Sequence, residues 1–216
     1  MNRKTLFVAS AIVLLLAFAG GALLYKSEKI QRWGKVIGQN QAALARDHSP
    51  TLGDANAKVH IVEFLDPACE TCSDFYPYVK RLMAANPDKI RLSIRHVPFH
   101  KGSDYVVKVL EASRKQDKYW QTLEAVLASQ ADWAPQHTAQ PELVWKAIGS
   151  VGLNLEQIKA DMNAPEIAQR IDQDRNDAGA LKVTKTPEFF VNGRPLPSFG
   201  LQQLQNLVKE ALQSAY

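Results

Sequence analysis

The chain has only two cysteines, and they lie three positions apart in the motif Cys69-Glu70-Thr71-Cys72. Any internal disulfide must join this pair, and it would close too small a loop to restrict the unfolded chain much. A purely stabilising role is therefore not expected. The spacing suits a disulfide that is made and broken by exchange, provided that the local structure activates one sulfur.

The residues around the motif predict that activation. Residues 59–65 form a mostly apolar, β-branched stretch typical of a strand, and apolar residues recur at helical spacing from residue 71 to about 85. Cys69 would then stand at the amino terminus of a helix, where unpaired backbone amides and the helix dipole favour a thiolate. We predict Cys69 as the exposed nucleophile and Cys72, one turn further on, as the resolving thiol.

The residues alone leave other roles for the two thiols open. Half of a zinc site would have the same spacing, but such sites normally have four ligands and no second cysteine pair exists. His96 and His100 could join the thiols around a soft metal such as copper. The thiols could also be buried and inert. We favour the redox interpretation, because the pair lies between a predicted strand and a predicted helix.

The remaining elements place the motif in an α/β layer architecture. A second strand is expected at residues 90–97. Asn192-Gly193 predicts a two-residue hairpin turn between short strands at 188–191 and 194–196, the latter an edge strand because it contains a proline. An amphipathic helix at 201–212 closes the chain. The order strand, helix, strand, helical block, hairpin, helix predicts an α/β fold with a long helical insertion.

The insertion, at about residues 103–163, is predicted to consist of several helices. Their starts are signalled by capping or first-turn residues, and one more helix follows the insertion. These positions are Ser103, Pro141, Asn154 with Gln157, and, for the later helix, Pro165.

The amino-terminal segment differs from the rest. Arg3 and Lys4 precede an apolar, uncharged run at residues 6–25, which is long enough to cross a bilayer as a helix. The triplet Ala17-Phe18-Ala19 has the pattern of a cleavage site, so a removed signal peptide is the alternative. We favour an uncleaved anchor, because the apolar run continues beyond the triplet. Either interpretation places the following domain outside the cytoplasm.

We therefore divide the chain into a signal anchor or signal peptide at residues 1–25, a polar juxtamembrane linker at 26–52, and one domain at 53–216. The net charge of +4 is mild, and no basic stripe with interleaved aromatic residues is present. Nucleic acid is consequently not an expected partner.

Two segments, residues 62–72 and 183–193, together resemble the DsbA family. Its members are thioredoxin-fold thiol–disulfide oxidoreductases of the bacterial cell envelope. The resemblance extends from about residue 50 to the carboxyl end and includes the helical insertion between the two halves of the fold. Thr186-Pro187 before the predicted hairpin is the more specific part, because a pair of cysteines at this spacing is common.

The resemblance implies a set of site residues. Pro187 would be a cis-proline facing the active-site disulfide, and the backbone of Thr186 would hold an extended substrate segment near Cys69. Glu63 would be a buried acid beneath the cysteines, with a raised pKa, that accepts the proton of Cys72. The resemblance also implies cysteine-containing exported proteins as substrates, a redox partner in the membrane, and no metal or organic cofactor.

The motif departs from the family pattern between its cysteines. Strongly oxidising members often have Pro-His there, whereas this chain has the two redox-tuning residues Glu70 and Thr71. A carboxylate beside Cys69 disfavours the thiolate, and the donor that histidine could offer is lost. We predict a higher pKa for Cys69 and a milder oxidant than those members. Pro67 also replaces a residue that is commonly aromatic.

We thus predict a thiol–disulfide oxidoreductase, acting as an oxidase in the bacterial periplasm and anchored in the inner membrane, or soluble there after signal cleavage. The nearest alternative is an isomerase or reductase, for which only residues 26–52 could supply an oligomerisation segment. Two alternatives come from other classes. One is a copper-binding module that uses Cys69, Cys72 and His96, and the other is a non-enzymatic envelope scaffold.

Overall fold

The computed structural model describes residues 42–44 and 46–216, together with Phe18, Gly20 and Gly21. Ala42–Tyr216 form one compact unit. Within the described residues, no helix combines the length and the apolar character that a membrane span requires. The predicted anchor at residues 6–25 lies outside the described residues, except for the three named above.

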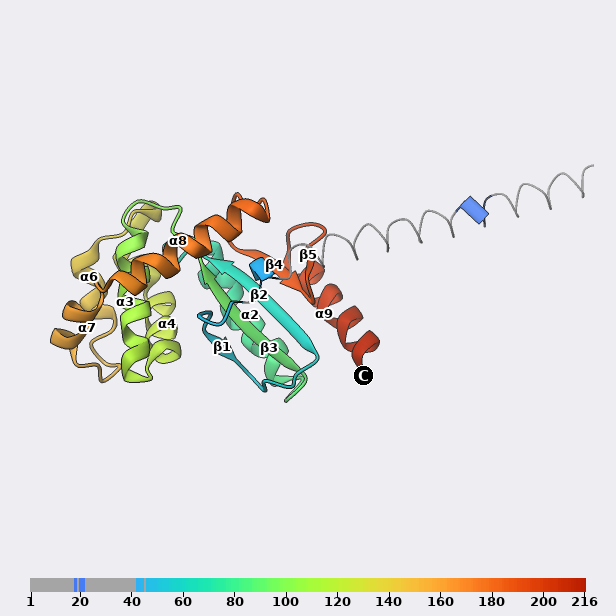
Figure 1. Ribbon diagram of the computed structural model, residues 1–216, viewed down its shortest axis with the longest axis horizontal. Coiled ribbons are helices and arrows are strands. Elements are labelled where there is room, and N and C mark those ends of the chain that lie inside the picture. The colour runs from blue at the N-terminus through green and yellow to red at the C-terminus, as the bar shows by residue number, and fades with distance from the viewer. Residues whose placement is uncertain (1–17, 19, 22–41, 45) are drawn as a thin grey trace, which may run out of the picture. The chain divides into compact units, whose positions relative to one another are not determined.

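A five-stranded sheet forms the centre of this unit (Figure 1). The two longest strands, β2 and β3, are parallel, and the other neighbours are antiparallel. The predicted strands are confirmed, and the two-residue strand β1 is the one strand of this sheet that was not predicted. In spatial order the strands are β1 (Thr51–Leu52), β3 (Ile90–His96), β2 (Val59–Leu65), β4 (Glu188–Val191) and β5 (Arg194–Pro195).

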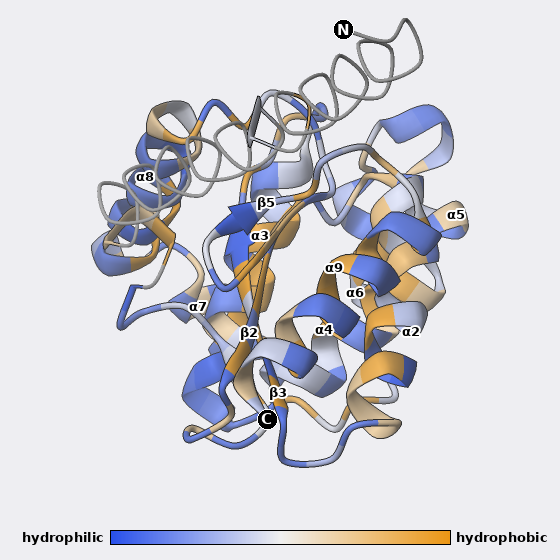
Figure 2. Ribbon diagram, turned by 90° about the vertical axis from the view of Figure 1, so that its right-hand side faces the viewer, coloured by the Kyte–Doolittle hydropathy of each residue, from blue (hydrophilic) through white to orange (hydrophobic). Residues whose placement is uncertain are grey.

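Helices cover both faces of the sheet and form a separate group beside it (Figures 1 and 2). Helices α2 (Glu70–Ala84) and α9 (Leu201–Ala215) pack on one face, and α8 (Pro165–Ala180) packs on the other. The helical insertion is confirmed. Its elements are α3 (Ser103–Ser113), the 3₁₀ turn Arg114–Gln116, α4 (Tyr119–Ala128), α5 (Gln130–Trp133), the 3₁₀ turn Pro135–His137, α6 (Pro141–Ala147) and α7 (Leu155–Asp161).

The predicted helix starts are confirmed with one exception. The side chain of Asn154 accepts the backbone N–H of Gln157 at 3.1 Å, as expected of an N-cap. Ser103, by contrast, is the first residue of α3 and not its cap. Gly102 precedes it with a left-handed φ of 76°, and the Ser103 hydroxyl donates to Asp66 instead. This hydrogen bond connects the first residue of α3 to the turn just before the cysteine motif.

The alternation of side chains along β2 decides what lies beneath the cysteines. Successive residues of a strand point to opposite faces, so Ile61, Glu63 and Leu65 share one face. Ile61 and Leu65 belong to the core cluster that contains α2 and α9, whereas Val62 and Phe64 pack toward the other face. Glu63 therefore points into the apolar layer under α2. Figure 2 shows hydrophobic residues along β2 and β3 at this centre.

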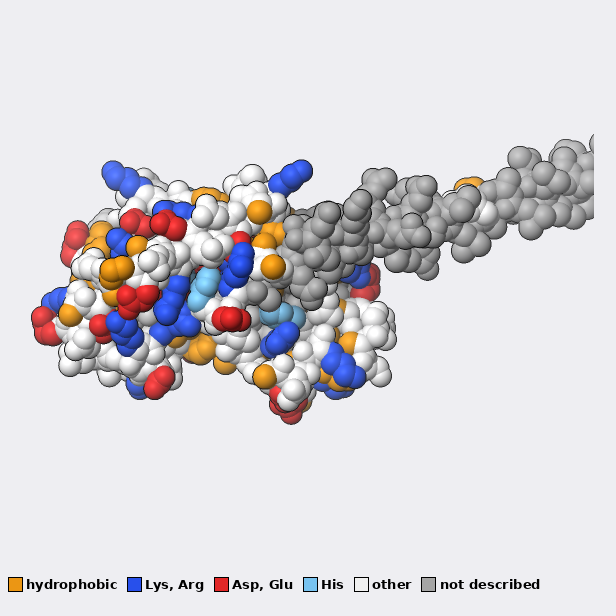
Figure 3. All heavy atoms as spheres, viewed as in Figure 1, with side chains coloured by type: hydrophobic (Ala, Val, Ile, Leu, Met, Phe, Trp, Pro, Cys, Tyr) orange, Lys and Arg blue, Asp and Glu red, His pale blue; other side chains and the backbone are white. Residues whose placement is uncertain are grey.

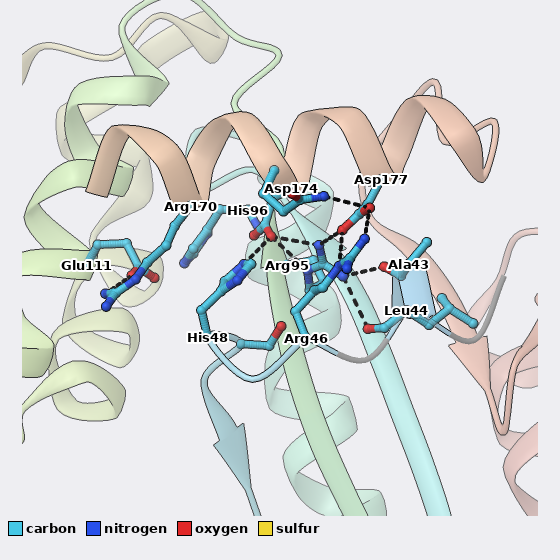
Figure 4. A network of polar contacts seen from close by, with 12 residues as sticks. Ala43, Leu44, Arg46, His48, Arg95, His96, Glu111, Arg170, Asp174 and Asp177 are labelled. Atoms are coloured by element: carbon cyan, nitrogen blue, oxygen red, sulfur yellow. Dashed lines mark hydrogen bonds and ion pairs between the residues drawn. The ribbon is translucent and has the colours of Figure 1, made fainter. Parts of the chain in front are cut away.

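A buried arginine joins α8 to the sheet. Arg95 of β3 is fully buried, and its guanidinium contacts Asp174 at 2.8 Å and Asp177 at 2.5 Å (Figure 4). It also donates to the carbonyl oxygen of Leu44 at 3.3 Å. A buried guanidinium is tolerated only when its charge and its donors are paired. Here two carboxylates and the backbone carbonyls of Ala43 and Leu44 pair with it.

The same acids hold the segment before β1 against the domain. Arg46 donates to Asp177 at 2.8 Å, and His48 lies 2.6 Å from Asp174. The described residues of 42–52 therefore belong to the compact unit, although the sequence analysis placed them in the linker. The polar composition of this segment suggested a solvated spacer, but its charges pair with buried acids of α8. The domain thus begins about ten residues earlier than predicted.

Acidic and basic side chains of the described residues are intermingled on the face shown in Figure 3. Such mixing fits the small net charge of +4.

Candidate active site

The cysteine motif lies where β2 passes into α2. The strand ends at Leu65, a short turn follows, and Cys69 is the N-cap residue of α2. The N–H of Cys69 donates to the carbonyl oxygen of Asp66 at 3.0 Å, and the N–H of Cys72 donates to the carbonyl of Cys69 at 3.1 Å. Both thiols are free. Cys69 is only 5% exposed, so it is less accessible than predicted, but Cys72 is fully buried.

The two thiols differ strongly in acidity. The pKa of Cys69 is lowered from 9.0 to about 6, chiefly by a hydrogen bond from Cys72. Thr186 and the positive charge of His100 lower it further, while burial acts in the opposite direction. Burial raises the pKa of Cys72 well above its usual value, and the charge of Glu63 adds to that effect. The pair can therefore hold a thiolate on Cys69 and a proton on Cys72.

The loop before β4 faces the first sulfur. The Thr186–Pro187 peptide bond is cis, as the family resemblance implies. The Sγ of Cys69 lies 3.3 Å from the carbonyl oxygen of Thr186, to which the thiol can donate. The antiparallel register that pairs Glu188 with Phe64 brings this loop back to the end of β2. Residues far apart in the sequence thus meet at Cys69.

Glu63 is completely buried in the middle of β2. In the sheet it lies between Ile94 of β3 and Phe189 of β4. Burial is the main cause that raises the pKa of its carboxyl to about 8, and the charge of Cys69 contributes. Among the described residues, neither carboxyl oxygen has a hydrogen-bond partner. A carboxyl of this acidity can take up or release a proton near neutral pH.

The two residues inside the motif have less influence than the sequence analysis predicted. Glu70 is exposed at the first turn of α2 and is not among the groups that shift the pKa of Cys69. Thr71 is half-buried and Pro67 is buried. An exposed carboxylate is screened by solvent, which weakens its effect on a neighbouring sulfur. The acidity of Cys69 is set mainly from other parts of the fold.

Sequence reasoning missed one functional candidate, Asp66, which is fully buried directly after β2. Its carboxylate accepts the backbone N–H groups of Phe99 at 2.7 Å and His100 at 2.8 Å, and the His100 ring lies 2.7 Å away. It also accepts the N–H of Ala68 at 2.9 Å and the hydroxyl of Ser103. An acid directly after an apolar strand was the only signal in the sequence.

His96 has a different environment from the one that a metal site needs. Its ring is buried and lies 2.8 Å from the hydroxyl of Tyr119. Within the described part of the chain, no group of three histidine, cysteine or acidic side chains is arranged to hold a metal ion. The described residues therefore offer no support for the copper-binding alternative.

Comparison with known proteins identifies relatives of this chain. Residues 45–210 match the family model described as thioredoxin. A solved thioredoxin-like oxidoreductase from Silicibacter pomeroyi DSS-3 is 32% identical, with a TM-score of 0.69 over 79% of this chain and 96% of the other.

Two curated relatives differ in how much of their length is matched. Disulfide bond formation protein D of Bacillus subtilis is 26% identical over 69% of this chain and 70% of that protein. The Na(+)/H(+) antiporter NhaA of Herminiimonas arsenicoxydans is 28% identical over 82% of this chain but only 28% of its own length. The chain thus spans about a quarter of the curated relatives that it matches first.

Proposed function

We propose that this chain, which belongs to the thioredoxin family, is a DsbA-type oxidoreductase that exchanges disulfides with cysteines of exported proteins. The unequal acidity of its two thiols carries this proposal. Cys69 has a pKa of about 6, and that of Cys72 is raised well above its usual value. One thiol can therefore react or leave as a thiolate, while the other keeps its proton.

In the oxidising direction, a substrate thiolate attacks the Sγ of Cys69 in a Cys69–Cys72 disulfide. The bond between the two cysteines breaks, and Cys72 leaves and takes up a proton. A second substrate thiolate then attacks the substrate sulfur of the mixed disulfide, and Cys69 leaves as a thiolate. The substrate loses two electrons and two protons, of which one proton stays on Cys72 and the other passes to solvent.

Glu63 is proposed as the proton relay for Cys72. With a pKa of about 8, its carboxyl is mostly protonated near neutral pH and can supply the proton that Cys72 needs as it leaves. In the reducing direction the same carboxylate would accept that proton. No oxygen of Glu63 is tied to another described residue, so the carboxyl is free to serve this step.

The cis-proline loop and two exposed aromatic side chains are proposed to receive the substrate chain. Thr186 and Pro187 border Cys69, and the backbone of Thr186 can pair with an extended segment beside the sulfur. Phe99, 49% exposed, donates its backbone N–H to Asp66 at 2.7 Å. The ring of Phe199, 45% exposed, packs in a tilted arrangement against Phe75 of α2, with ring centroids 4.9 Å apart. Apolar side chains at these positions suit an unfolded polypeptide with exposed hydrophobic residues.

The family resemblance supports a periplasmic location, anchoring through residues 6–25 and a membrane redox partner that resets the disulfide. The nearest alternative is the reverse direction, that of an isomerase or reductase. The reduction potential of the cysteine pair and its redox state in the cell envelope would separate the two directions, because a disulfide donor requires a high potential and a mostly oxidised pair.

The exchange chemistry itself is tested with the full chain and a short peptide that contains two cysteines. The oxidised protein should convert the reduced peptide to its disulfide, seen by mass spectrometry. With the disulfide form of the peptide, Cys72→Ser should accumulate a peptide adduct on Cys69 that dithiothreitol removes, and Cys69→Ser should form none. Peptide oxidation at an undiminished rate by a variant in which serine replaces both cysteines would refute the proposal.

A further inference from the structure

The imidazole of His100 is held in one orientation next to the cysteine loop. Its Nδ1 lies 2.7 Å from Oδ2 of Asp66, which also accepts the His100 backbone N–H at 2.8 Å. A carboxylate can only accept hydrogen bonds, so Nδ1 carries a proton. A second proton must therefore bind at Nε2, for which no partner occurs among the described residues. With both protons the ring is a cation.

A second histidine places this ring beside Cys69. The ring of His137 stacks on that of His100 with centroids 4.9 Å apart and planes 25° from parallel. Nδ1 of His137 lies 3.4 Å from the carbonyl oxygen of Ala68, the residue directly before Cys69. Nε2 of Gln130 donates to the same carbonyl at 2.7 Å. The two imidazoles thus border the turn that leads into α2.

We propose that His100, oriented by Asp66 and backed by His137, is a positioning residue that places a positive charge beside Cys69 and favours its thiolate. This inference rests on the proposed function and names the group that tunes the reacting sulfur. His100 would supply, from the loop between β3 and α3, the charge that Glu70 and Thr71 cannot supply from inside the motif.

The charges around Cys69 agree with this assignment. The groups that face it are Cys72 from α2, Glu63 from β2, Thr186 from the loop before β4, and His100. Among these, His100 is the one that can carry a positive charge, and its charge lowers the pKa of Cys69. Glu63 opposes it whenever its carboxyl is ionised.

Stabilising the thiolate stabilises the reduced protein and so makes the disulfide a better oxidant. His100 therefore adjusts the strength of the oxidant without touching the substrate. Asp66 also accepts a hydrogen bond from the hydroxyl of Ser103, the first residue of α3. The orientation of the His100 ring therefore depends on how the helical insertion is positioned. The positive charge that acts on the Cys69 sulfur thus comes from a loop distant in the sequence and not from the residues between the two cysteines.

The test measures how fast iodoacetamide alkylates Cys69 in the reduced full chain across a series of pH values. Near pH 6, the pKa of Cys69, His100→Gln should slow the reaction about two- to fivefold and move the profile to higher pH. His100→Lys, which keeps a cation, should restore the profile. Lys101→Gln removes one positive charge from the neighbouring exposed position and should leave the profile unchanged.

An unchanged profile in His100→Gln would overturn the proposal, and so would a His100→Lys variant that behaves like His100→Gln. An equal shift in Lys101→Gln would also overturn it, because the effect would then come from general charge. Alkylation requires no protein substrate. Failure of this test therefore leaves the exchange function to be judged by peptide oxidation, and failure of peptide oxidation leaves the alkylation result standing.

Discussion

Replacing Glu63 by Gln should make the reduced protein more stable, by an amount that depends on pH. The carboxyl is fully buried, and its pKa rises from 4.5 to about 8 on folding. An acid whose pKa is raised in the folded state contributes stability that is fully present below the unfolded pKa. That stability is lost as the pH rises through the folded pKa. The window of loss therefore runs from pH 4.5 to about 8.

The size of the effect follows from the same shift. Between these two pH values the unfolded chain has released the proton and the folded protein has kept it, so stability falls by about 1.4 kcal/mol per pH unit. The cost reaches about 3 kcal/mol near pH 7 and about 5 kcal/mol above pH 8. A glutamine has nearly the same shape and does not titrate. The stability difference between Glu63→Gln and the unchanged protein should grow along this slope.

Urea unfolding of both proteins, kept reduced, between about pH 5 and pH 8 measures this difference. The test depends on how steeply the difference in unfolding free energy changes with pH. Burying the Gln amide adds a cost that does not vary with pH, so this cost does not affect the slope. Glu70→Gln, which removes a carboxyl from the exposed start of α2, is the matched control. A flat difference for Glu63→Gln would refute the raised pKa and, with it, the proton relay. In the oxidised protein the slope should extend over a narrower pH window, since Cys69 then has no charge to raise the pKa.

Two further predictions follow from the structure. Near pH 7, iodoacetamide should modify Cys69 and spare Cys72 in peptide mass spectrometry, because their pKa values lie on opposite sides of the usual thiol value; equal labelling would contradict the assigned roles. Arg95→Met should lower the free energy of unfolding by about 3 kcal/mol or more, because it removes the fully buried cation from Asp174 and Asp177 and leaves them, within the described residues, only the partly exposed His48 and Arg46 as basic partners. A loss below about 1 kcal/mol in urea unfolding would show that water replaces the guanidinium.

The parts of the site that are close in sequence were predictable from it. The strand Val59–Leu65 and the helix Glu70–Ala84 follow from local hydrophobic patterns, and these two elements alone put Cys69 at a helix amino terminus. The hairpin after residue 187 follows from Asn192-Gly193, whose turn chemistry is equally local. Each of these features needs only the neighbouring residues to specify it.

The contacts between distant loops were not predictable in this way. Asp66, His100 and His137 come from three different connections and show no periodicity that would relate them. Arg95 gave a misleading signal, because alternating polar and apolar residues in a strand indicate one face in water. In the fold that face is covered by α8, whose Asp174 makes the arginine part of the interior.

The acidity of Cys69 is therefore not set by the two residues between the cysteines. Glu70 alone suggested a weakly acidic Cys69, yet the pKa is about 6 because other groups face the sulfur. Reference values for such cysteines are about 3.5 in DsbA and about 7 in thioredoxin. Cys69 lies nearer the second value, so we still expect a milder oxidant than DsbA. The reason is that the charge of His100 acts from a neighbouring loop, while a histidine inside the motif would be adjacent to the sulfur.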